Sequence, residues 1–269
     1  MMTGASVLLR VGQGPPYAGW GFWHCGAGVG LVAVPLSRKD DPATNASMSP
    51  PMKALLFLGS RRASTPPQPK RLGERVCAFL GTHLASRFET TLIDPLDYPA
   101  TEIFKPVFAY AESSKPSQLA ALERQIVEAD AYVMVSPEYN HSMSPALADL
   151  LNHFPSSAFA FKPSLIATYS SGQWGGTRAA VNMRAYLSEL GCLPVSAMLH
   201  FPHADKAFEA DGRPAADQDS ARWAKYASRG IEQLHWWAEA AAQQRAAVDP
   251  FAASPAFRRT PSERDAPAG

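Results

Sequence analysis

The chain has 269 residues, a length typical of one or two domains, and 46% of them are hydrophobic, which is enough for a substantial core. Charged residues make up 18% and the formal net charge is +1, so the composition gives no support for a nucleic-acid or acidic-polymer partner. Three cysteines, Cys25, Cys77 and Cys192, form no CxxC pair and no metal-ligand spacing. This favours a reducing compartment and predicts a cytoplasmic protein without a metal site. No apolar run is long enough to span a bilayer, so no membrane partner is expected.

Residues 1–50 are rich in Gly, Ala and Pro and end in a linker-like stretch. The segment 26–31 is similar to a dinucleotide fingerprint, but Leu31 occupies the last glycine position of G-x-G-x-x-G. We expect an N-terminal extension that is either disordered or a targeting peptide. The alternative, which we favour over targeting, is an upstream extension of the reading frame with Met48 or Met52 as the working start.

From residue 51 onward, apolar runs alternate with amphipathic helical patterns. The runs predict buried strands at about 53–58, 90–94, 131–135, 163–169 and 193–199. Helical spacing predicts helices at about 72–84, 117–128, 145–154, 178–190 and 219–246. We expect irregular structure at 95–115 and 201–217, a main domain over 51–247, and a disordered tail at 248–269.

Alternating strands and helices predict an α/β fold with a doubly wound parallel sheet and helices on both faces. Five strands suggest the flavodoxin-like order 2-1-3-4-5, with the topological switch point between the first and third strands. The loops at 59–71 and 136–144 would then lie on either side of one crevice, with 170–177 on its far side. Ligands in such folds bind outside the carboxyl ends of the strands.

The loop after the third strand reads Ser-Pro-Glu-Tyr-Asn at 136–140. Pro137 restricts the backbone, Tyr139 offers a flat π-face, and Asn140 and the loop amides offer hydrogen bonds. Ser144 precedes a proline, which predicts an N-cap and the first position of a helix. A flat heteroaromatic ligand suits this combination.

The loop after the first strand begins Gly59-Ser60-Arg61-Arg62 and precedes a helix. Backbone amides, hydroxyls and a cation at a helix N-terminus are what a phosphate requires, although the loop is not a Walker A sequence. By itself the segment also fits an ordinary basic surface loop. A third segment, 170–178, has glycines that allow close approach of the backbone to a ring. Whether Trp174 covers that ring or only packs stays open.

Together these motifs resemble the NADPH-dependent FMN reductase family, a flavodoxin-like group. Ser-Pro-Glu-Tyr-Asn is similar to the family's flavin-ring loop, and Gly59, Ser60 and Arg62 match the start of its phosphate loop. The resemblance covers about 52–200. Prolines at 66, 67 and 69 leave open whether Ser64, Thr65 or Arg71 supplies the remaining phosphate contact. The FMN-binding residues that the resemblance implies are Ser60, Arg62, Ser64, Arg71, Pro137, Glu138, Tyr139, Asn140, Ser170, Gly172, Gly175 and Gly176.

The resemblance implies an oxidoreductase that passes hydride from NADPH to FMN and then reduces a quinone, a free flavin or another small acceptor. Because the flavin carries the chemistry, no catalytic side chain is expected. Family members are usually dimers or tetramers with the flavin near the subunit interface, and Glu138 and the following helix would be interface elements. One alternative is a non-enzymatic flavin-binding electron carrier or redox-sensing protein, although a carrier would be strongly acidic. Another is a nucleotide-binding hydrolase on the same fold, which predicts no bound flavin.

Overall fold

The computed structural model describes residues 51–62, 71–98 and 103–258. Three predictions lie outside these residues: the N-terminal extension at 1–50, the phosphate contact from Ser64, and the end of the tail at 259–269.

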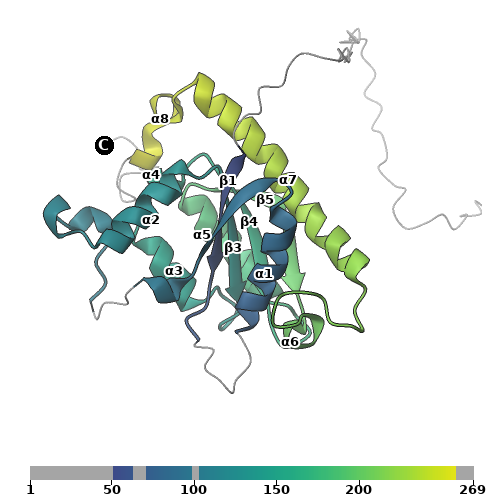
Figure 1. Cartoon of the computed structure of the whole chain (residues 1–269). Helices are drawn as coiled ribbons and strands as arrows, with labels where there is room; N and C mark the ends of the chain where they lie inside the picture. The colour runs from purple at the N-terminus through teal and green to yellow at the C-terminus, as the bar shows by residue number, and fades with distance from the viewer. Residues whose placement is uncertain (1–50, 63–70, 99–102, 259–269) are drawn as a thin grey trace, which may run out of the picture. The chain divides into compact units, whose positions relative to one another are not determined.

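Five parallel strands form one sheet in the order β2-β1-β3-β4-β5 (Figure 1). Their bounds are β1 (Met52–Leu58), β2 (Phe88–Ile93), β3 (Ala131–Pro137), β4 (Pro163–Tyr169) and β5 (Leu193–Phe201). Strand β1 pairs with β2 on one side and with β3 on the other. The order in which strands are added therefore reverses between β1 and β3. The predicted fold class, strand order and switch point are confirmed.

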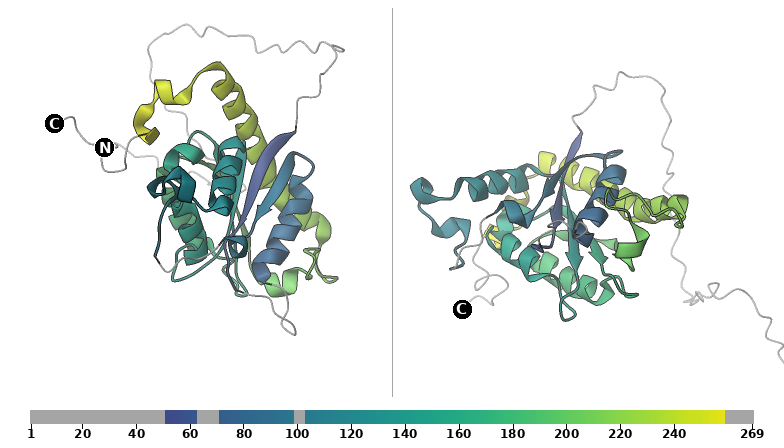
Figure 2. Two further views of the ribbon diagram at one scale, coloured as in Figure 1. Left: turned by 60° about the vertical axis from the view of Figure 1, so that its left-hand side comes forward. Right: turned by 60° about the horizontal axis from the view of Figure 1, so that its bottom comes forward.

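Helices cover both faces of the sheet (Figure 2). Among the described residues they are α1 (Leu72–Leu84), α2 (Ser117–Glu128), α3 (Pro145–Asn152), α4 (Ser156–Phe159), α5 (Thr177–Glu189), α6 (Ala204–Ala207), α7 (Ser220–Ala247) and α8 (Pro250–Ala253). Four 3₁₀ turns occur in the same residues, at η1 (Pro95–Asp97), η2 (Val107–Ala109), η3 (Glu112–Ser114) and η4 (Pro255–Arg258). None of the helices described is both long and apolar enough to cross a membrane.

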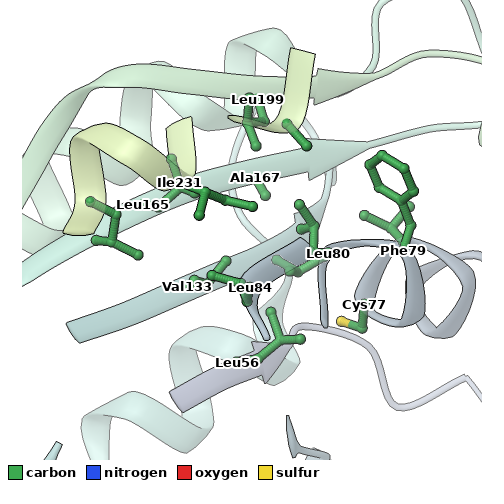
Figure 3. Close-up of a cluster of buried hydrophobic side chains, with 14 of the residues drawn as sticks. Leu56, Cys77, Phe79, Leu80, Leu84, Val133, Leu165, Ala167, Leu199 and Ile231 are labelled. Atoms are coloured by element: carbon green, nitrogen blue, oxygen red, sulfur yellow. The ribbon is translucent and has the colours of Figure 1, made fainter. Parts of the chain in front are cut away.

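The sheet separates two buried cores. On one face, α1 and α7 pack Leu80 and Ile231 against strand residues such as Val133 (Figure 3). On the other face, α2, α3 and α5 pack side chains such as Leu122 against Met134. Each fully buried aliphatic side chain contributes about 1.5–3 kcal/mol, so the sheet is a rigid base for the loops at its edge. Both described cysteines are free and buried, one in each core.

The structure differs from the predictions in short elements. The expected disordered tail begins instead with α8 and η4. The ring of Phe161 makes edge contacts with Phe251 and Phe257, at centroid separations of 5.3 and 5.8 Å. These aromatic contacts hold the segment, and sequence periodicity does not reveal them. Helices α4 and α6 were likewise not predicted, because one turn is too short to show a helical period.

Lys162 binds the end of α2 on the second face. Its Nζ donates to the carbonyl oxygens of Ile126 at 2.8 Å and Val127 at 2.6 Å. It therefore satisfies carbonyls that the helix itself leaves without partners. Burial, with a smaller contribution from nearby Arg245, lowers the pKa of Lys162 to about 8.

The free energy of unfolding should therefore rise with pH where Lys162 titrates. Between about pH 8 and 10.5 the unfolded chain keeps a proton on this amine that the folded chain has lost. Relative to its value below pH 8, the free energy of unfolding should therefore increase by up to about 3 kcal/mol at the upper end of this range. Urea denaturation of the wild type and of Lys162→Met at pH 7 and 10 measures this. The gap in stability between the two proteins should change in favour of the wild type at pH 10. An equal gap at both pH values would contradict the assignment.

Candidate functional site

The first loop (59–62) and the second loop (136–144) face each other across a crevice at the carboxyl ends of β1 and β3. A pocket of about 610 Å³ lies between them, with walls from both loops and from the start of α3. Its lining residues are Ser60, Arg61, Arg62, Tyr139, Ser144, Pro145, Ala146 and Asp149. The structure thus brings three of the predicted site residues, Ser60, Arg62 and Tyr139, to one pocket.

In the first loop a hydroxyl and a cation lie side by side. Ser60 is buried, and its Oγ accepts a hydrogen bond from the amide of Arg62 at 3.3 Å. The side chain of Arg62 is exposed, whereas Arg61 is paired with Asp149 of α3 at 3.0 Å. Arg62 is therefore the better placed of the two cations to meet a phosphate in the pocket.

Arg71, the other predicted phosphate contact among the described residues, lies behind the loop at the N-cap of α1. Its Nε donates to Glu74 Oε1 at 2.6 Å, and its Nη2 is paired with Asp94. Burial lowers the pKa of Arg71, but the hydrogen bonds to Asp94 and Glu74 outweigh burial and raise it. Arg71 does not line the pocket.

Two serines close the second loop. Ser136 Oγ accepts from the amide of Ser144 at 2.9 Å and donates to the carbonyl oxygen of Pro137 at 2.8 Å. Ser144 Oγ accepts from the amide of Ala146 at 3.1 Å, and Pro145 occupies the first turn of α3. The predicted N-cap and helix start are confirmed.

The tip of the second loop is a tight turn that the sequence pattern did not predict. Tyr139 and Ser142 exchange hydrogen bonds of 3.0 and 2.9 Å, and the two residues between them, Asn140 and His141, have φ of 48° and 64°. Two successive positive φ values define a type I′ turn, which favours Asn-Gly. Asn140 is the residue that could have indicated this turn, but His141 stands at the position where glycine would complete the usual Asn-Gly pair. The bonds that close the turn do not use the amides of Asn140 and His141, so these donors can face a ligand.

Helix α5 holds the second loop from the side. Arg178 Nη2 pairs with Glu138 Oε1 at 2.8 Å, and the Arg178 guanidinium carbon lies over the Trp174 ring, 5.9 Å from its centroid. One turn further on, Asn182 Nδ2 donates to the carbonyl oxygen of His141 at 2.6 Å. Glu138 Oε2 is buried and has no hydrogen-bond partner among the described residues.

Arg178→Met should destabilise the fold, because it leaves the Glu138 carboxylate, 11% exposed, without its counter-ion. Arg178 itself is half exposed, so we expect a modest loss of about 1–2 kcal/mol in the free energy of unfolding. Urea denaturation measures it, and Arg178→Met combined with Glu138→Gln should recover part of the loss. Equal instability of the single and double variants would contradict the pairing.

The third segment is ordered by its own hydrogen bonds. Ser170 Oγ donates to the carbonyl oxygen of Gly172 at 2.8 Å and accepts from the amide of Gly175 at 3.0 Å. Gly175 and Gly176 have φ of 57° and 76°, and a Cβ on Gly176 would lie 2.8 Å from that of Thr168. The turn itself thus requires these two glycines. At Gly172 a Cβ would meet nothing closer than 4.0 Å, so this glycine is the one with open space beside it.

These features fit FMN. Within 51–62, 71–98 and 103–258 there is no group of three or more His, Cys, Asp or Glu side chains that could hold a metal. The crevice instead offers a cation and a hydroxyl on one side, from Arg62 and Ser60. On the other side it offers the aromatic ring of Tyr139, which is 41% exposed. A flat ring carrying a phosphate matches that set.

A family model described as NADPH-dependent FMN reductase matches residues 52–206, more than half of the chain. The chain belongs to the NADPH-dependent FMN reductase family. The family prediction is confirmed, and the names of the family and of its relatives pair FMN with NADPH or NAD(P)H.

Individual relatives match shorter stretches. A quinone reductase of Escherichia coli (strain K12) is 40% identical over 79 residues, which are 28% of this chain and 42% of that protein. An NAD(P)H-dependent FMN reductase of Pseudomonas aeruginosa is 33% identical over 107 residues, 38% of this chain and 58% of that protein. The chain spans about half the length of these curated relatives.

Among solved structures, FerB from Paracoccus denitrificans, described as a flavoenzyme NAD(P)H:(acceptor) oxidoreductase, superimposes with a TM-score of 0.53 and 20% identity. The match covers 70% of this chain and 97% of that one. At this identity the similarity is evidence for the fold, and it agrees with the strand order of the sheet.

Proposed function

We propose that this protein is an FMN-containing oxidoreductase that takes hydride from NADPH and passes electrons to a quinone, a flavin or another small acceptor. The observation that carries the proposal is the crevice at the switch point, where Tyr139 faces Ser60 and Arg62 across one pocket. Family membership supports the cofactors, and the quinone reductase of Escherichia coli supports a quinone as acceptor.

In this proposal the side chains bind and orient, whereas the bound FMN supplies hydride acceptance and electron transfer. Ser60 and Arg62 hold the phosphate, with Arg62 as its counter-charge. Tyr139 provides the platform for the ring, and the amides of Asn140 and His141 donate to its polar edge. Arg178 and Asn182 keep these groups in register from α5.

Steady-state oxidation of NADPH by the full chain, with FMN and benzoquinone, tests the proposal. Turnover that requires both FMN and the quinone is the expected result. If FMN binds but NADPH is not oxidised, the protein is a flavin-binding electron carrier or a redox sensor. If FMN does not bind, the nucleotide-binding hydrolase on the same fold is the better explanation.

The proposal includes a homodimer or homotetramer. Several large apolar side chains after β2 are exposed, among them Leu96, Ile103 and Phe108 at 51%, 81% and 69%. Exposed apolar side chains that gather in one patch are typical of protein interfaces, and these three lie within 13 residues of one another in the sequence. Light scattering with size-exclusion chromatography at micromolar concentration should give at least twice the monomer mass, and a monomer mass would contradict this part of the proposal.

A further inference from the structure

The buried cluster behind the first loop joins three parts of the chain through one guanidinium. Arg71 stands at the N-cap of α1, Glu74 lies in the first turn of that helix, and Asp94 follows β2. The Arg71 side chain is 5% exposed, and those of Asp94 and Glu74 are 19% and 24% exposed. Besides both carboxylates, Arg71 binds the first loop, since its Nη1 donates to the carbonyl oxygen of Ser60 at 2.7 Å.

The charges of this cluster do not suit a phosphate. Among the described side chains, two carboxylates surround one guanidinium, and these three groups carry a formal charge of −1 in a largely buried place. A phosphate dianion that came into contact with Arg71 would also meet Asp94 and Glu74, and the repulsion would offset the attraction. The Asp94 carboxylate is itself fixed in position, because its Oδ1 accepts a hydrogen bond from the amide of Leu96 at 3.0 Å.

The bond from Arg71 to Ser60 orients a peptide group. The carbonyl of Ser60 and the amide N–H of Arg61 belong to one planar trans peptide and point in opposite directions. Because the carbonyl points toward Arg71, the N–H points away from the buried cluster. Both residues of this peptide line the pocket. Arg71 thus determines the direction of a backbone donor in the loop that is proposed to hold the phosphate.

We propose that Arg71 is a positioning residue for the first loop, anchored by Asp94, and acts on the phosphate of FMN through the Ser60–Arg61 peptide. This inference rests on the proposed function, since the phosphate is the group that the loop would hold. Asp94 and Arg71 then work as a unit, so loss of either one frees the peptide and weakens phosphate binding in the same direction.

The sign of the effect of Asp94→Asn separates positioning from direct contact. Dissociation constants for FMN and riboflavin are measured by quenching of flavin fluorescence, at about 0.05 and 0.5 M salt, because high salt screens long-range charge effects. Asp94→Asn and Arg71→Met should each weaken FMN binding about tenfold and change riboflavin binding less than about twofold. If Arg71 were itself a phosphate ligand, removing a competing carboxylate would tighten FMN binding, and that result would overturn the proposal.

Glu232→Gln is the matched control. It removes the same charge from a carboxylate that also pairs with an arginine, Arg87, at 2.9 Å but does not line the pocket, and it should leave FMN binding unchanged. Arg71→Lys keeps a donor for the Ser60 carbonyl and should restore part of the affinity that Arg71→Met loses. The double variant Arg71→Met with Asp94→Asn should bind FMN no more weakly than the weaker single variant.

Riboflavin affinity also reports that each variant is folded, since riboflavin lacks the phosphate but needs the same ring site. If the wild type fails to bind FMN, the proposed function itself is wrong. If the wild type binds FMN and Asp94→Asn binds it as tightly or more tightly, only the role of Arg71 is wrong.

Discussion

Replacing Tyr139 by alanine should weaken FMN binding about ten- to hundredfold, the usual range when an aromatic platform is removed from a stacked ring. The side chain is 41% exposed and lines the pocket, whereas its backbone amide and carbonyl close the turn with Ser142. Alanine keeps those backbone bonds, so the free energy of unfolding should change by less than about 0.5 kcal/mol. Titration of the full chain with FMN measures the affinity, and urea denaturation measures the stability.

Tyr139→Phe is the control, because phenylalanine keeps the π-face and should keep most of the affinity. Combining Tyr139→Ala with Asn140→Ala should weaken binding further, because alanine disfavours the positive φ of 48° at this position. Trp174→Ala tests the exposed ring of the third segment, which is 62% exposed. Unchanged affinity in Tyr139→Ala together with a large loss in Trp174→Ala would move the flavin ring away from the second loop.

Gly59→Ala should destabilise the fold by about 2–4 kcal/mol and lower the melting temperature by roughly 5–15 °C. A Cβ at this position would lie 2.5 Å from the carbonyl oxygen of Val135 and 3.2 Å from the Cα of Ser136. Both are backbone atoms at the end of β3, so no side chain can move aside. The shift would also break the 2.7 Å hydrogen bond from the amide of Gly59 to Val135. Thermal unfolding followed by circular dichroism measures the effect.

Gly172→Ala is the paired control, since nothing lies closer than 4.0 Å to the added methyl group. Its melting temperature should stay within about 2 °C of the wild type. A small effect of Gly59→Ala, comparable with that of Gly172→Ala, would contradict the close contact between the first loop and β3. If Gly172→Ala instead weakens FMN binding without loss of stability, the flavin lies against the third segment.

The sheet was predictable because each strand is a compact apolar run bounded by turn residues. Strand β4 carries its apolar signal over its whole length, and its predicted bounds are those observed. Phe88, by contrast, extends β2 beyond the predicted range because it packs on His235 of α7, a contact that no local pattern encodes. The same limit applies to the short helices, whose order comes from tertiary packing.

At the site, the positions of the loops could be predicted from the sequence better than the roles of individual residues. Strand order alone brings the first and second loops together, so Ser60 and Tyr139 were found. The partner of Arg71 at the end of β2 lies 23 residues away in the chain, so sequence spacing could not indicate it. Similarly, the sequence predicts that Gly176 lets the backbone approach a ring closely. The structure shows instead that the turn itself requires this glycine, because its φ is positive and an added Cβ would lie too close to Thr168.

The central claim is that the crevice between the two loops holds an FMN that NADPH reduces. The most direct test is the visible absorption spectrum of the full chain reconstituted with FMN, recorded before and after anaerobic addition of NADPH. We expect a bound-flavin spectrum whose visible absorption band bleaches quickly once NADPH is added. Free FMN that does not associate with the protein, or bound FMN that stays oxidised after NADPH is added, would contradict the account.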